Sequence, residues 1–223
     1  MTLSEAIAAF LASSRDHSSA LDILSDYSSE SAIENLRCLT GSLLRDFLAR
    51  WYVEKASANR DALPAPSELL SALASFVEWA DEHARAGLKV EWLPIINELA
   101  ESLPRALDIY YSLSEHLAAR GGAFVFPEFL ASFEEGGRGL YDIDAPGEAG
   151  AREGYFRILS VQGGAALVED LLTEEVMGPV LLPYDVASLA GEGYILNLEL
   201  VRCPEGWQVT GSGFAYPPGT ELE

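Results

Sequence analysis

Apolar residues recur every three or four positions along the first half of the chain, which is the spacing of amphipathic helices. Gly41 and Pro104 interrupt this pattern, so we expect a kink or a split at each. Pro66 and Ser67 open one of the helices, with either serine as its cap or proline in its first turn. The predicted helical segments cover residues 3–11, 20–27, 31–56, 67–87 and 91–120.

The apolar period falls toward two after Gly121-Gly122, and glycine-rich or acidic turns separate short apolar runs. Strands are predicted at residues 155–161, 165–171, 176–183, 194–202 and 207–216, with a further short one near 140–143. The predicted fold class is therefore α+β: an N-terminal α-helical bundle followed by a small antiparallel β-barrel-like part, SH3-like or a rolled sheet. We assign residues 1–120 to the helical domain, 121–153 to a glycine-rich acidic connecting segment and 154–223 to the β domain.

Charge narrows the choice of partner. The 223 residues include 35 acidic and 14 basic side chains, a net charge of −21, and residues 121–223 contain no lysine. Nucleic-acid backbones are held mainly by Lys and Arg, so direct nucleic-acid binding is not expected. We expect a protein partner, and the acidic field favours a basic one.

The region from about Tyr155 to Pro218 resembles a small β domain of uncharacterised bacterial proteins. The likeness lies in the run Val168-Glu169-Asp170-Leu171-Leu172-Thr173-Glu174-Glu175, then Trp207 and a closing Phe214-Ala215-Tyr216-Pro217-Pro218. In that pattern the tight turn reads Leu-Thr-Gly-Glu, whereas this chain has Glu174 where glycine is expected. Some of those proteins also carry a SEC-C metal-binding motif, which is absent here. The resemblance supports the barrel prediction and implies no activity.

Residues that commonly carry catalysis do not form a recognisable motif. Cys38 and Cys203 are far apart in the sequence, so we expect reduced thiols buried as small hydrophobic groups. His17, His83 and His116 lack the spacing of a zinc hydrolase and lie among charged residues, so we expect solvated helical histidines. No phosphate-binding loop occurs, and we assign no catalytic or cofactor-binding residue.

One acidic loop has a partial match to a twelve-residue calcium site. Counting from Asp142, Asp144 takes position three, Gly147 position six and Glu153 position twelve. Pro146 at position five supplies no side-chain oxygen, and the flanks do not read as two helices. We expect an exposed acidic loop, with calcium or magnesium binding by Asp142, Asp144 and Glu153 as the alternative.

A second group of carboxylates brackets the predicted hairpin, and we expect it to be solvated: Glu169, Asp170, Glu174 and Glu175. The start of the chain lacks the features of a signal peptide, and no apolar run could span a membrane, so we expect a cytoplasmic protein. The main hypothesis is a non-enzymatic protein-interaction or regulatory module that uses the barrel or the groove beside it. The alternatives are a carboxylate-based metal-binding protein or hydrolase, and an acidic mimic of nucleic acid that inhibits a DNA-binding protein. The oligomeric state is left open.

Overall fold

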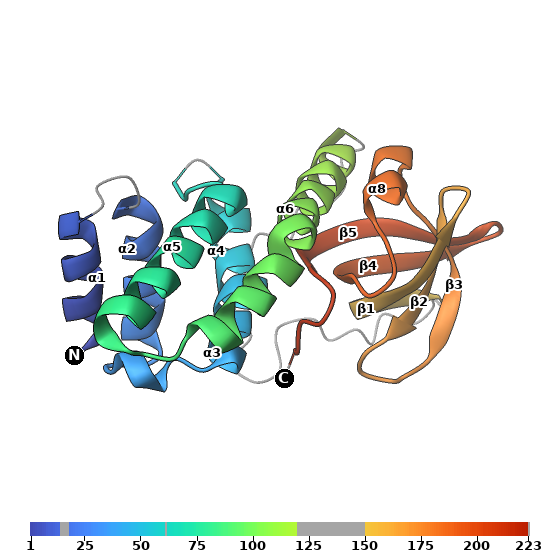
Figure 1. Ribbon diagram of the computed structural model, residues 1–223. Helices are drawn as coiled ribbons and strands as arrows, with labels where there is room; N and C mark the ends of the chain where they lie inside the picture. The colour runs from blue at the N-terminus through green and yellow to red at the C-terminus, as the bar shows by residue number, and fades with distance from the viewer. Residues whose placement is uncertain (14–17, 61, 120–149, 223) are drawn as a thin grey trace. The chain divides into compact units, whose positions relative to one another are not determined.

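The computed structural model describes residues 1–13, 18–60, 62–119 and 150–222 (Figure 1). The chain is mixed helix and sheet, with most helices in the N-terminal half, as predicted. It divides into two compact units. The helical unit comprises Met1–Pro104 with Thr220–Glu223, and the β unit comprises Arg105–Gly219. The predicted short strand near 140–143 and most of the connecting segment lie outside the described residues.

Apolar helix faces form the core of the helical unit. Phe10 of α1 and Phe76 of α5 meet edge to face, with 5.7 Å between their ring centroids, and both side chains are buried. Helix α5 also contacts α2, so that α1, α2 and α5 pack together (Figure 1). Helix α5 begins at Pro66, so proline occupies the first turn and Ser67 is not the cap. The helices outside residues 36–58 are α1 (Leu3–Ser13), α2 (Ser18–Glu30), α5 (Pro66–Ala84) and α6 (Lys89–Ala119).

A helix over 31–56 with a kink or split at Gly41 was predicted; a helical path does begin at Gly41, but the prediction is wrong before that residue, where only the short η2 is helical. The helical path starts only at Gly41, because Thr40 ends an extended stretch and its side chain accepts a hydrogen bond from the Leu43 N–H. It then includes a π-helical stretch, which sequence periodicity cannot distinguish from an α-helix. The observed elements are η2 (Leu36–Cys38), α3 (Gly41–Asp46), η3 (Phe47–Trp51) and α4 (Tyr52–Ala58).

Helix α6 is not divided at Pro104, although proline lacks the backbone N–H that would continue the hydrogen-bond ladder. The boundary between the two units nevertheless falls at this residue. The apolar face of the second half of α6 belongs to the core of the β unit, which is why the boundary lies inside the helix rather than at residue 120. The α6 residues in that core are Ala106, Ile109, Tyr110, Leu113 and Leu117.

The five predicted strands are present, with ends that differ by a few residues. The strands were predicted correctly because buried and exposed positions alternate along them. In β2, for example, Ala166 and Val168 face the core while Leu167 between them is exposed. The strands are β1 (Ala151–Gln162), β2 (Ala165–Asp170), β3 (Val176–Leu181), β4 (Ile195–Cys203) and β5 (Gly206–Tyr216).

Strand pairing follows the order β1-β2-β3-β5-β4, and β1 also pairs with β4. Strands β4, β1, β2 and β3 lie in the spatial order of a Greek key, with the long connection between β3 and β4 returning the chain to β1. That connection contains helix α8 (Tyr184–Leu189), which was not predicted.

The expectation of a purely antiparallel sheet is wrong at one pair. Strands β3 and β5 are parallel where Val180 and Leu181 face Trp207 and Gln208. The antiparallel pairs β1–β2, β2–β3 and β1–β4 make β3 and β4 run in opposite directions. Because β5 lies between β3 and β4 and is antiparallel to β4, it must be parallel to β3.

Candidate functional site

The residues predicted to bind a metal are only partly described by the structure. Asp142 and Asp144 lie outside the described residues. Glu153 is on β1, exposed, and faces Glu199 of β4 across the strands. Partial burial raises the pKa of Glu199, and the negative charge of Glu153 raises it further. The two carboxylates therefore repel each other.

The described residues offer no further ligands for a metal at this pair. No group of three or more His, Cys, Asp or Glu side chains in the described part of the chain is placed to hold a metal ion. The assignment of Asp142, Asp144 and Glu153 to a calcium or magnesium site stays a prediction.

The histidines differ in environment. His17 lies outside the described residues. His83 is exposed, as predicted, and its ring stacks on Trp79 while Nδ1 donates to the Trp79 carbonyl oxygen at 3.0 Å. His116 is only partly exposed, with its Nε2 2.7 Å from the Asp185 Oδ1 at the start of α8. His116 is therefore a partly exposed helical histidine, as predicted, and folding gives its ring a carboxylate partner from a distant segment that was not predicted.

The ion pair sets the charge state of Asp185. Partial burial acts to raise its pKa, but the hydrogen bonds from His116 and the Val186 N–H and the nearby imidazole charge lower it overall. In this hydrogen bond the carboxylate accepts and Nε2 of His116 carries the proton.

Both cysteines are free thiols, but the prediction that they are buried is wrong. Cys38 is exposed in η2, and Cys203 is half-buried at the end of β4. Neither position belongs to a hydrophobic core, because η2 is a short surface turn and β4 ends at Cys203. Among the described residues, the hydrogen-bond partner of the His116 ring is Asp185 rather than Cys203.

A groove of about 300 Å³ lies within the β unit, beside the C-terminal end of α6. We call it the α6 groove. Its lining comes from three segments that are far apart in the sequence. The lining residues are Leu113, His116, Leu117, Leu181, Leu182, Pro183, Cys203, Glu205, Gln208 and Val209.

The turn between β2 and β3 forms a second surface feature. Leu172 in this turn is 90% exposed, and Leu167 of β2 and Val176 of β3 are 42% and 54% exposed. We call these three residues the hairpin patch. The three residues belong to one hairpin, on β2, in the turn and on β3.

The hairpin turn has a fixed conformation. Asp170 is buried, and its Oδ1 accepts from the N–H groups of Leu172 at 2.9 Å and Thr173 at 3.3 Å. Backbone bonds from Asp170 N–H to the Glu175 carbonyl and from Glu174 N–H to the Asp170 carbonyl close the turn. Glu174 has a left-handed backbone with φ of 57°, which glycine adopts more easily. The sequence signal that could have indicated the exposed Leu172 is the pair of adjacent leucines after the apolar strand β2.

No helix in the described segments has the length and apolar character needed to cross a bilayer. Comparison of the chain with protein-family models, curated proteins and solved structures finds no match. The resemblance of residues 155–218 to a small bacterial β domain therefore stays a prediction, and the geometry alone carries the functional argument.

Proposed function

We propose that the protein is a non-enzymatic interaction or regulatory module that binds another protein through the hairpin patch. The observation that carries this proposal is the 90% exposure of Leu172 on a turn whose conformation is fixed by Asp170. A rigid turn loses little conformational entropy on binding, so the leucine can act as a preorganised anchor for a pocket on the partner.

The net charge of the chain, rather than the charges beside the patch, favours a basic partner. Glu169 and Glu175 beside the patch are neutralised by ion pairs with Arg157 at 3.0 Å and Arg152 at 3.2 Å, respectively. Glu174 adds a further exposed carboxylate. With a net charge of −21 on the chain, electrostatic attraction would speed encounter with a positively charged protein and repel nucleic acid.

We also propose that the sheet is a small barrel-like module of the SH3-like or rolled-sheet kind. Its support is the pairing, in which each of the five strands has two neighbours. Such closure removes free sheet edges, so a partner would bind outward-facing side chains rather than add a strand.

A photocrosslinking experiment tests the interaction. Benzoylphenylalanine is placed at Leu172 in one variant and, as the matched control, at Val90 in another, because Val90 is 83% exposed on the helical unit. We expect a crosslinked protein at position 172 that is absent at position 90. That protein is then purified and its affinity for the wild type, L172D and V90D is measured.

We expect L172D to weaken binding by about thirtyfold, the effect of losing an anchor worth about 2 kcal/mol, and V90D to leave it unchanged. Both substitutions are at exposed positions, so melting temperatures should stay close to that of the wild type. Equal crosslinking at the two positions, or full affinity of L172D, would refute the proposal.

A further inference from the structure

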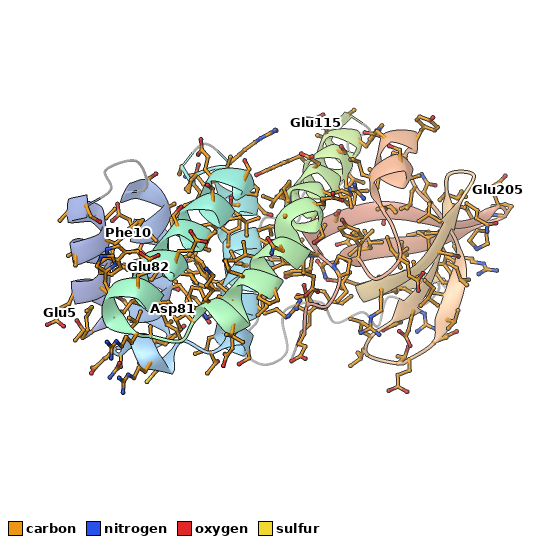
Figure 2. All side chains as sticks on the ribbon, viewed as in Figure 1. Glu5, Phe10, Asp81, Glu82, Glu115 and Glu205 are labelled. Atoms are coloured by element: carbon orange, nitrogen blue, oxygen red, sulfur yellow. The ribbon has the colours of Figure 1, made fainter. Side chains whose placement is uncertain are left out.

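The α6 groove has an apolar floor. Four of its lining side chains are at most 8% exposed: Leu113 and Leu117 of α6, Leu182 after β3 and Val209 of β5. Glu205, the acidic residue among the described lining residues, is exposed on the turn between β4 and β5 (Figure 2). An apolar occupant therefore fills the groove without taking this carboxylate out of water.

The size of the groove suits an aromatic side chain. Its volume is about 300 Å³. A cavity of about 150 Å³ lined by leucine, isoleucine and phenylalanine accommodates a benzene ring. The groove therefore has room for one or two phenyl rings.

The chain contains an aromatic segment shortly after α6. Residues 123–133 read Ala-Phe-Val-Phe-Pro-Glu-Phe-Leu-Ala-Ser-Phe, and we call them the phenylalanine segment. They lie outside the described residues. All the phenylalanines that the structure does describe are buried, at no more than 6% exposure. An apolar composition of this kind, with a single charge, favours burial against a protein surface over solvation.

The phenylalanine segment is within reach of the groove. Leu117, which lines the groove, precedes Phe124 by seven residues, and seven residues span at most about 25 Å. The chain from Leu130 to Ala151 at the start of β1 spans up to about 70 Å, so the return to the sheet does not prevent docking. A short tether also gives the segment a local concentration on the order of millimolar. Repulsion between chains of net charge −21 disfavours a second copy as the source of the occupant.

We propose that the phenylalanine segment docks in the α6 groove of its own chain, with a phenylalanine side chain on the leucine and valine floor. The groove and the hairpin patch share no residue, so this proposal and the protein-binding proposal stand or fall separately.

Photocrosslinking of the full chain tests where the segment binds. Benzoylphenylalanine replaces Phe126 in one variant and Tyr141 in the matched control, because Tyr141 is an aromatic residue of the same part of the sequence. We expect position 126 to crosslink to peptides around Leu181 or Gln208, which line the groove but are distant in the sequence, and position 141 not to do so. An equal mixture of isotope-labelled and unlabelled protein shows whether each crosslink joins one chain or two, and we expect one.

A thiol footprint gives an independent measurement, because Cys203 lines the groove and is half-buried. The readout is the rate at which iodoacetamide, a neutral reagent, alkylates Cys203 in the C38S background. Two triple variants are compared, one in the phenylalanine segment and one, as its control, further along the chain. They are F124S/F126S/F129S and L140S/Y141S/I143S.

We expect the variant in the phenylalanine segment to speed alkylation of Cys203 about three- to tenfold, because loss of phenylalanine burial weakens docking by about tenfold or more. The control variant should leave the rate unchanged. Alkylation of the exposed Cys38, measured in the C203S background, should be the same in both triple variants.

Several results would overturn the proposal. Crosslinks from position 126 that avoid the groove, or that match those from position 141, would place the segment elsewhere. Crosslinks that join two chains would show that the occupant comes from a second copy. Equal alkylation of Cys203 in the two triple variants, or no reaction in either, would show that the segment does not shield the groove.

Discussion

Exchange of Glu174 for glycine is expected to stabilise the β unit. Glu174 sits in the turn between β2 and β3 with φ of 57°, where its Cβ crowds the backbone. Its side chain takes part in no hydrogen bond or ion pair with another described residue, so its removal breaks no stabilising contact. The turn itself is held by Asp170 and by backbone hydrogen bonds, all of which survive the exchange.

The size of the effect follows from two opposing contributions. A non-glycine residue in the left-handed region loses about 1–2 kcal/mol of stability relative to glycine. Glycine, however, gives the unfolded chain more freedom, which lowers the free energy of unfolding by about 0.4–1 kcal/mol. The difference between the midpoints of these ranges, about 1.5 and about 0.7 kcal/mol, predicts that E174G raises the free energy of unfolding by about 0.8 kcal/mol.

Native-state hydrogen exchange provides the assay, because it reports on the β unit separately from the helical unit. The amides of Val168 in β2 and Val180 in β3 are both in the core of the sheet. Where these amides exchange through unfolding of the whole β unit, their exchange should slow about two- to fivefold in E174G.

The neighbouring Thr173 supplies the matched control. Its backbone is not left-handed, so T173G adds freedom to the unfolded chain and relieves no strain. We expect T173G to destabilise the unit by about 0.4–1 kcal/mol. A neutral or destabilising E174G, or a T173G that stabilises equally, would refute the assignment of strain to Glu174.

Two further predictions concern the sheet. E199Q should raise the free energy of unfolding by about 0.5–1 kcal/mol at pH 7, because it removes the repulsion between Glu199 and Glu153. The folded-state pKa of Glu199 is raised, so ionised Glu199 opposes folding above that pKa. The gain in stability from E199Q should therefore vanish near pH 3, where Glu199 is protonated in both the folded and the unfolded state. Urea titrations at pH 7 and pH 3 measure this, and a gain that persists at pH 3 would contradict it. G206A should destabilise the unit by at least about 2 kcal/mol, because Gly206 has φ of 147° and a Cβ there would overlap the Pro179 carbonyl oxygen. G211A should change stability by less than about 1 kcal/mol, since its added Cβ meets only the movable end of the Glu199 side chain; equal losses in the two glycine variants would show that the backbone contact at 206 is not decisive.

The sheet was predictable because its signal is local. In β2, the alternation of buried Ala166 and Val168 with less buried neighbours identifies a strand without knowledge of what it pairs with. The direction of β5 relative to β3 depends on insertion between distant strands, which no local pattern encodes. Helix α8 was missed because six residues are too few to show a helical period.

The helical half shows the same limit in another form. The prediction of a helix over residues 31–56, kinked or split at Gly41, is right at Gly41, where α3 begins, and wrong before it, where Thr40 ends an extended stretch. The α6 groove was not predictable for a related reason. His116 and Asp185 are separated by many residues, and only the packed β unit brings the imidazole and the carboxylate to 2.7 Å.

The turn between β2 and β3 departs from ordinary turn chemistry twice within three residues. Leu172 exposes nearly all of its side chain and so contributes almost nothing to folding, while Glu174 adopts a conformation that opposes it. Sequences that break local rules without a compensating contact do so mainly at functional sites. The joint signature of a binding turn would be a stabilised E174G and an L172D that keeps its stability but loses its partner. A turn that served only to connect two strands would show the first of these effects without the second.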